Sequence, residues 1–211
     1  MTEAALRQEI VWWGQSLFAR GLTSGTSGNI TVRCGDGFLA TPTNSCLGRL
    51  DPARLSRLDA GWHLLDGDPP TKEIALHRPF YRAGRDVGAV VHLHSTYATA
   101  LSCRSDIDSG NALHAVTPYV VMRLGSVPVL PYARPGSDLL EPQLHELAAS
   151  HAGVLLGNHG PIVSGTALAA AAGAIEELEE AAKLAHLLRG VPVRYLTDAD
   201  IAELTTFFGG R

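Results

Sequence analysis

The sequence lacks any apolar run of the roughly 18 residues needed to span a bilayer, so a membrane protein is not expected. Charges at Glu3 and Arg7 interrupt the first apolar stretch early, so we expect no secretory signal. Cysteine is also scarce, with three residues, Cys34, Cys46 and Cys103, and no CxxC pair. An odd number without such a pair favours reduced thiols in a cytoplasmic protein and argues against a disulfide framework.

An excess of basic charge is missing, because 17 lysines and arginines stand against 21 aspartates and glutamates, for a net charge of −4. Without a basic stripe to neutralise phosphates, a nucleic-acid partner is not expected. No G-x-G-x-x-G follows the first predicted strand, and the pattern G-x-x-x-x-G-K-[ST] is absent. These absences argue against a dinucleotide-binding fold and a nucleotide-phosphate loop, but not against a local pocket for one small anion.

The chain does have the length and apolar content of a globular domain, with 211 residues of which 45% are hydrophobic, and we expect one α/β domain over 1–211. Helical spacing of apolar residues predicts helices at 3–20, 71–83, 95–102, 117–123, 137–150, 166–189 and 198–208. Short apolar runs predict strands at 30–33, 38–40, 87–93, 127–130 and 154–156, and residues 41–70 are expected to hold turns and short strands. The first two strands are expected to form a hairpin, and Thr71 is expected to cap the second helix. The irregular alternation indicates a mixed sheet flanked by helices.

Two histidines stand out at the end of the strand predicted over 87–93. His92 and His94 are two positions apart, so both imidazoles leave the same face of a strand. Such a pair supplies two of the three protein ligands of a catalytic metal site, although His-x-His also occurs by chance. His159 follows the buried strand at 154–156, in a glycine-flanked turn where packing explains a histidine poorly. Together the three histidines predict a divalent metal site with a position open for substrate; the alternative is that His159 is simply a turn residue.

Glu73 lies at the start of a predicted helix. It either complements the helix dipole in the first turn or acts as a general acid/base beside the metal. His77 lies one turn later on the same helix face, where it either orients Glu73 or packs. The turn over 25–29 (GTSGN) brings small residues, backbone N–H groups and hydroxyls together, which is typical of an anion-binding turn. Similar donors at 43–45 and 71–72 favour a pocket for a small phosphate.

Taken together, these segments resemble the class II aldolase/adducin family, whose motifs they follow in order over roughly residues 5–190. The segments that carry the resemblance are SGNITV at 27–32, TPT at 41–43, KE at 72–73, HLHS at 92–95 and NHG at 158–160. The resemblance implies an αβα sandwich around a mainly antiparallel sheet. It also implies a cyclic homotetramer with active sites between subunits. Adducin-like members lack the histidines, whereas this chain has them and the glutamate, which counts against a non-catalytic assembly module.

The resemblance also assigns roles to individual residues. His92, His94 and His159 match the metal ligands, and Glu73 matches the catalytic acid/base. The positions that match binding of the substrate phosphate are Thr26, Gly28, Asn29, Thr43, Asn44, Thr71 and Lys72. Tyr119 resembles the tyrosine that a neighbouring subunit supplies as a proton donor. Aldolases of the family commonly have Ser-Ser before the glutamate, whereas this chain has Thr-Lys, so the lysine is expected to add charge toward the phosphate or a carboxylate.

Residues 41–56 and 67–73 are most similar to one branch of the family, the 3-oxo-tetronate 4-phosphate decarboxylases. Such an enzyme takes a small phosphorylated sugar acid and leaves dihydroxyacetone phosphate and carbon dioxide through a metal-stabilised enediolate. A ketose 1-phosphate aldolase of the fuculose or ribulose type is the alternative, because both share the metal residues. We expect one divalent ion per subunit, zinc first, with manganese, cobalt or nickel as alternatives. Arg49 is expected either to recognise a substrate carboxylate or to form an ion pair at a subunit interface.

Overall fold

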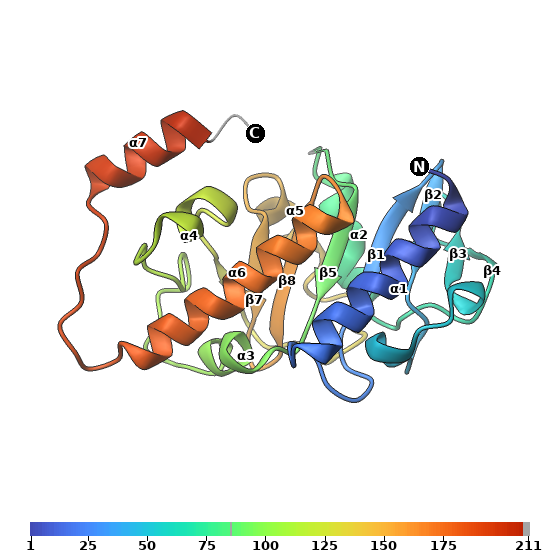
Figure 1. Cartoon of the computed structure of the whole chain (residues 1–211), viewed down its shortest axis with the longest axis horizontal. Coiled ribbons are helices and arrows are strands. Elements are labelled where there is room, and N and C mark those ends of the chain that lie inside the picture. The colour runs from blue at the N-terminus through green and yellow to red at the C-terminus, as the bar shows by residue number, and fades with distance from the viewer. Residues whose placement is uncertain (85, 209–211) are drawn as a thin grey trace.

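One sheet runs through the computed structural model, which describes residues 1–84 and 86–208 (Figure 1). The expected domain range of 1–211 also includes residues 85 and 209–211, which lie outside the described residues. The strands are β1 (Asn29–Cys34), β2 (Gly37–Ala40), β3 (Ser56–Leu58), β4 (Leu64–Asp66), β5 (Ala89–His92), β6 (Val129–Leu130), β7 (Gly153–Leu156) and β8 (Gly160–Gly165). Their order across the sheet is β4-β3-β2-β1-β5-β8-β7-β6, and only the β6–β7 pair is parallel among the described strands. The mainly antiparallel sheet expected from the resemblance is confirmed.

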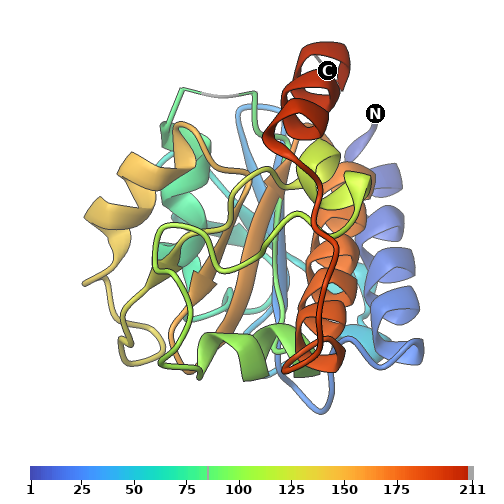
Figure 2. The same ribbon diagram turned by 90° about the vertical axis from the view of Figure 1, so that its left-hand side faces the viewer.

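Helices cover both faces of this sheet, as the view along its edge shows (Figure 2). They are α1 (Glu3–Ala19), α2 (Ile74–Arg82), α3 (Thr96–Ser102), α4 (Pro118–Arg123), α5 (Glu141–Ala148), α6 (Leu168–Leu187) and α7 (Asp198–Phe208). α1, α3 and α6 pack on one face, and α2 and α5 pack on the other. α4 packs on α6, and α7 packs on α4. This αβα arrangement confirms the expected fold, and none of the described helices combines the length and apolar character needed to cross a membrane.

The alternation of side chains along β5 separates the two cores. Ala89 and Val91 belong to the core under α1 and α6, whereas Val90 belongs to the core under α2. Burying each large aliphatic side chain contributes roughly 1.5–3 kcal/mol, and a slip of one residue would reverse every side chain, so the register is well fixed. His92 continues the alternation after Val91, and its side chain therefore leaves the sheet on the α2 face.

Most predicted elements are present with ends shifted by a few residues, but two differ more. The cap at Thr71 is wrong, because α2 begins at Ile74 and Glu73 holds the N-cap position. The Thr71 hydroxyl instead accepts a hydrogen bond from the backbone N–H of Glu73 at 3.2 Å. The sequence predicts no strand over 160–165, where β8 forms and pairs with both β5 and β7. Its first residues, a glycine and a proline, disfavour a strand until both neighbours are in place.

Candidate metal centre

Four side chains with metal-binding atoms meet at one end of the sheet on the α2 face. His92 is the last residue of β5, and His94 lies two residues beyond it. His159 lies in the turn that joins β7 to β8, and Glu73 occupies the N-cap of α2. One ligand atom from each of the four residues lies within 4.8 Å of the others. We call these residues the His/Glu cluster.

The β7–β8 turn places His159 through a backbone that few residues can adopt. Asn158 has a φ of 56° and Gly160 a φ of 150°, values that residues with side chains rarely adopt. A Cβ atom on Gly160 would lie 2.5 Å from the carbonyl oxygen of Leu93, so only glycine permits this approach to the end of β5. The backbone N–H of His159 donates to the carbonyl of Leu156 at 3.0 Å and closes the turn. The turn therefore holds His159 beside His92, at the end of β5, and His94 just beyond it.

His92 is fully buried and turns one ring nitrogen toward the cluster. Its Nδ1 donates to the carbonyl oxygen of Pro161 at 2.8 Å, since a carbonyl can only accept. Burial lowers the pKa of His92 to about 3, so the ring is neutral near neutral pH and Nε2 keeps a free lone pair. That Nε2 lies 3.1 Å from Nε2 of His94, whose pKa is also lowered by burial. The two nitrogens therefore face each other with one proton at most between them.

Glu73 supplies the carboxylate of the cluster. Burial alone would raise its pKa, but the imidazoles of His159 and His92 and a hydrogen bond from Asn29 outweigh it, so the pKa of Glu73 lies well below its usual range. Asn29 Nδ2 donates to Oε2 of Glu73 at 2.7 Å. Oε1 lies 3.2 Å from Nε2 of His159, and Oε2 lies 3.5 Å from Nε2 of His92. The cluster thus places a buried negative charge beside imidazole nitrogens.

These donor atoms fit a divalent metal ion. Nε2 of His159 is buried, and although Oε1 of Glu73 lies 3.2 Å away, no described atom meets the geometry of a hydrogen bond to it. A buried polar atom without a partner is costly unless a ligand satisfies it. Neutral imidazole nitrogens and a carboxylate oxygen are ligands that zinc and similar divalent ions prefer. The chain therefore has the residues to hold a divalent ion at this end of the sheet.

A pocket of about 170 Å³ opens beside the cluster and is lined by Glu73 and His94. The lining also includes all the residues matched to phosphate binding by the resemblance, namely Thr26, Gly28, Asn29, Thr43, Asn44, Thr71 and Lys72. We call it the polar pocket. Lys72 is exposed there, and no ion pair with another described residue holds its ammonium group. Residues from three separate loops thus offer hydroxyl, amide and ammonium donors to one small space next to the cluster.

Two further lining residues, Pro135 and Gly136, were not expected from the sequence. They lie in the segment between β6 and α5, which passes close to Lys72: a Cβ atom on Gly136 would lie 3.5 Å from the carbonyl oxygen of Lys72. No local motif marks this contact, because it arises only when distant segments come together. A neighbouring pocket of about 300 Å³ shares Thr26, Pro42, Thr43 and Asn44 with the polar pocket. Arg49 lines this neighbouring pocket and not the polar pocket.

Tyr119 is the predicted site residue that the chain does not bring to the cluster. It lies in the first turn of α4 with 53% of its surface exposed, and it does not line the polar pocket. The resemblance assigns this tyrosine to the site of a neighbouring subunit, and that assignment stays a prediction.

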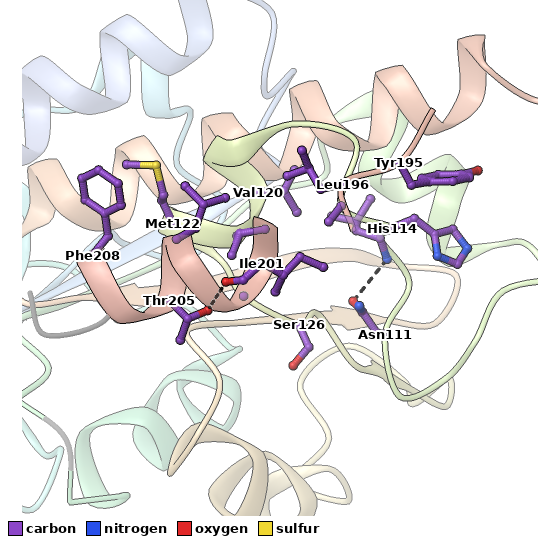
Figure 3. Close-up of a pocket in the computed structure, with 15 residues that line it drawn as sticks. Asn111, His114, Val120, Met122, Ser126, Tyr195, Leu196, Ile201, Thr205 and Phe208 are labelled. Atoms are coloured by element: carbon purple, nitrogen blue, oxygen red, sulfur yellow. Dashed lines mark hydrogen bonds between the residues drawn. The ribbon is translucent and has the colours of Figure 1, made fainter. Parts of the chain in front are cut away.

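A larger cavity, of about 520 Å³, lies between α4, α7 and the loops at 111–115 and 195–196 (Figure 3). We call it the C-terminal cavity. Its lining is mainly aliphatic and aromatic, and its titratable residues are His114 and Tyr195. These two rings contact each other edge to face, with centroids 5.4 Å apart. The larger cavity therefore offers far fewer groups for chemistry than the polar pocket.

Known proteins resemble this chain over nearly its whole length. A family model described as the class II aldolase and adducin N-terminal domain matches residues 8–186. The chain is 51% identical over 203 residues to a 3-oxo-tetronate 4-phosphate decarboxylase of Escherichia coli K12, covering 96% of each chain. It is 32% identical over 192 residues to the L-fuculose phosphate aldolase of Escherichia coli K12, covering 89% of this chain and 86% of that enzyme. The crystal structure of YgbL from Escherichia coli is similar with a TM-score of 0.93 and 49% identity, covering 96% of this chain and 98% of that one.

Proposed function

The chain belongs to the class II aldolase and adducin family, and from this premise we propose that it is a lyase that decarboxylates a 3-oxo-tetronate 4-phosphate. The observation that carries the proposal is the His/Glu cluster opening into a polar pocket lined by Lys72. A four-carbon sugar acid phosphate has matching parts, a phosphate for the pocket and a ketone and hydroxyl for the cluster. The 51% identity to the Escherichia coli decarboxylase supports the same substrate class.

The proposed reaction breaks the bond between the carboxylate carbon and C2 of the substrate. Carbon dioxide leaves, and the electron pair of that bond moves through C2 and C3 onto the ketone oxygen, which gives an enediolate. When bound, a divalent ion supplies a Lewis acid for this developing negative charge. A proton added at C2 then gives dihydroxyacetone phosphate. We propose zinc as the ion because imidazole and carboxylate ligands suit it, with manganese, cobalt or nickel as alternatives.

Glu73 is the residue proposed to handle the proton. Decarboxylation consumes one proton per turnover, so a group near C2 must take a proton from water and deliver it to the enediolate carbon. The low pKa of Glu73 keeps it charged at neutral pH, and it therefore acts first as an acceptor. Asn29 holds its Oε2, which fixes the direction of the carboxylate. General acid–base help of this kind typically contributes about 10²–10⁴-fold. Tyr119, supplied by a neighbouring subunit of a homotetramer, is the proposed alternative donor.

The polar pocket is proposed to bind the phosphate at the other end of the substrate. Lys72 contributes a compact positive charge, and the pocket also has threonine hydroxyls and asparagine amides as donors. Gly28 has a φ of 80°, and a Cβ atom there would lie 3.0 Å from the carbonyl oxygen of His92, so a glycine allows this loop to approach β5 closely. Binding the remote phosphate orients the ketone toward the cluster, and this orientation lowers the barrier of the chemical step.

A ketose 1-phosphate aldolase is the second candidate, favoured by the 32% identity to the fuculose phosphate aldolase. Both reactions pass through the same enediolate of dihydroxyacetone phosphate, so the His/Glu cluster serves either one. They differ in the group that leaves, an aldehyde in one case and carbon dioxide in the other. A non-catalytic adducin-like module is disfavoured by the complete set of metal-binding side chains.

The test is to incubate the purified protein with a 3-oxo-tetronate 4-phosphate and, separately, with fuculose and ribulose 1-phosphates. Dihydroxyacetone phosphate and carbon dioxide from the first substrate would support the proposal. If only the ketose 1-phosphates react, giving dihydroxyacetone phosphate and an aldehyde, the protein is an aldolase and the decarboxylase proposal is refuted. Elemental analysis of protein purified without chelator identifies the ion, and light scattering measures the proposed homotetramer. We propose a cytoplasmic location because the three cysteines are free.

A further inference from the structure

A chain of hydrogen bonds leads from Glu73 into the core on the α2 face of the sheet. Asn29 Nδ2 donates to Glu73 Oε2 at 2.7 Å, and Asn29 Oδ1 lies 2.5 Å from Nε2 of His77. Nδ1 of His77 lies 2.9 Å from the hydroxyl of Thr31. His77 and Thr31 are fully buried, and Asn29 is 5% exposed. Both ring nitrogens of His77 therefore have a partner in a region closed to water.

The direction of each bond follows from the carboxylate at one end. A charged carboxylate only accepts, so the amide nitrogen of Asn29 faces Glu73 and the amide oxygen faces His77. That oxygen also only accepts, so Nε2 of His77 carries the ring proton. Burial lowers the pKa of His77 to about 4, so the ring is neutral near neutral pH and its Nδ1 accepts from the hydroxyl of Thr31. One orientation of the amide and one tautomer of the ring satisfy every atom.

We propose that His77 is a positioning residue for Glu73, acting through Asn29. The Nε2–H group of His77 holds the Asn29 amide in the orientation that donates to Oε2, and this leaves Oε1 on the side of His159. Without that group the amide can turn over and present its oxygen to the carboxylate, where two acceptors repel each other. His77 does not line the polar pocket, so its influence passes through its neighbour. The consequence for turnover rests on the proposed function.

Packing alone does not explain these contacts. Leu76 and Phe80 fill the same buried side of α2 with apolar side chains, so this position has no need of a polar ring to occupy space. Burying an imidazole costs free energy unless both nitrogens are bonded. His77 has both ring nitrogens bonded, and through Asn29 it connects the Glu73 carboxylate to the core on the α2 face.

A series of variants separates positioning from stability. His77→Leu removes both ring contacts and is expected to lower kcat about 10–100-fold, with KM and bound metal unchanged. His77→Gln restores one donor and one acceptor, so most of the lost turnover should return. Thr31→Val removes the donor to Nδ1, and Tyr81→Phe removes a hydroxyl 3.0 Å from that of Thr31, one link further away. The loss of kcat should shrink in the order His77→Leu, Thr31→Val, Tyr81→Phe. A loss of kcat that follows melting temperature instead of this order would overturn the proposal.

A second measurement does not depend on turnover. Heteronuclear NMR of the full chain with isotope-labelled histidine reports which ring nitrogen carries the proton. The signal that is absent from the spectrum of His77→Gln is assigned to His77. We expect the proton on Nε2 near neutral pH. A proton on Nδ1 would overturn the positioning role whichever substrate proves correct. Wild-type protein that turns over neither substrate class would refute the proposed function alone, because the tautomer is measured independently.

Discussion

The polar pocket beside Glu73 and the C-terminal cavity are both concave, but they are built from opposite kinds of residues. In the polar pocket, of about 170 Å³, a carboxylate, an imidazole and an ammonium group line one small space. The C-terminal cavity, of about 520 Å³, is lined mostly by aliphatic and aromatic side chains. The region with the greater volume therefore has the poorer set of reactive groups, and volume alone would have pointed away from the His/Glu cluster.

The two regions also differ in how they are supported. The histidines of the His/Glu cluster lie at the ends of β5 and β8, two strands that are inside the sheet with a paired strand on each side. The C-terminal cavity is closed by α7, which packs on α4 and has no buried residue among those described. Donor atoms that must stay at fixed distances need rigid support, and strands paired on both sides supply it.

The largest expected effect comes from removing His159, and removing His114 from the other region is the control. His159→Ala should abolish turnover and bound metal together, because it removes a donor from a cluster with few alternatives. His114→Ala, in the lining of the C-terminal cavity, should leave the metal content unchanged. Elemental analysis and kcat measured on the same preparations test both. A His159→Ala protein with a full complement of metal would show that the cluster is not the metal site.

Glu73→Gln is expected to have the next largest effect and to separate metal binding from proton handling. The amide keeps the shape and can still accept from Asn29, and the three histidines remain, so the metal should stay bound. Turnover should fall about 10²–10⁴-fold, because the group proposed to accept and return the proton is lost. Glu177→Gln, which changes a half-buried carboxyl on α6, is the matched control and should leave kcat unchanged. Full activity in Glu73→Gln would remove this residue from the mechanism.

The histidines of the His/Glu cluster could be predicted from the sequence because their signals are local. His92 and His94 lie two positions apart next to an apolar strand, and that spacing alone places both on one face. The glycines beside His159 mark a tight turn without any knowledge of the fold. Periodicity of the same local kind predicted α1, α6 and the β1–β2 hairpin, which are present with small shifts at their ends.

What the sequence did not predict depends on contacts between distant segments. The backbone N–H of Thr71 donates to the carbonyl of Thr41 at 3.1 Å, so this residue continues an extended segment and α2 begins three residues later. β8 begins with a glycine and a proline, and it forms only because β5 and β7 pair with it on both sides. Pro135 and Gly136 reach the polar pocket through the folding of the whole chain. No window of neighbouring residues contains this information.

Acid provides a further test of the region behind Glu73, with an expected effect of about 3 kcal/mol for His77. Burial lowers the pKa of His77 from 6.5 to about 4, so between these values the unfolded chain binds more protons than the folded one. The free energy of unfolding of metal-free protein should therefore be highest above pH 6.5 and fall as the pH drops toward 4, by about 3 kcal/mol for this residue. Urea unfolding at several pH values measures the slope. His77→Gln should reduce this slope by the contribution of one residue, because the buried imidazoles of His92 and His94 contribute in the same direction and remain. Equal slopes in wild type and His77→Gln would contradict the argument.

Lys72→Met sharpens the comparison within the polar pocket and has the smallest expected effect. Losing a charge-assisted hydrogen bond to phosphate costs roughly 1.5–3 kcal/mol, so KM should rise about 10–100-fold while bound metal is unchanged. Lys183→Met is the matched control, because this half-buried lysine on α6 is paired with Glu180 at 3.7 Å and does not line the polar pocket. The inhibition constant of inorganic phosphate should rise together with KM in Lys72→Met, and neither should change in Lys183→Met. An unchanged KM would place the phosphate outside the polar pocket, and Arg49→Met in the neighbouring pocket would then be the variant to raise it.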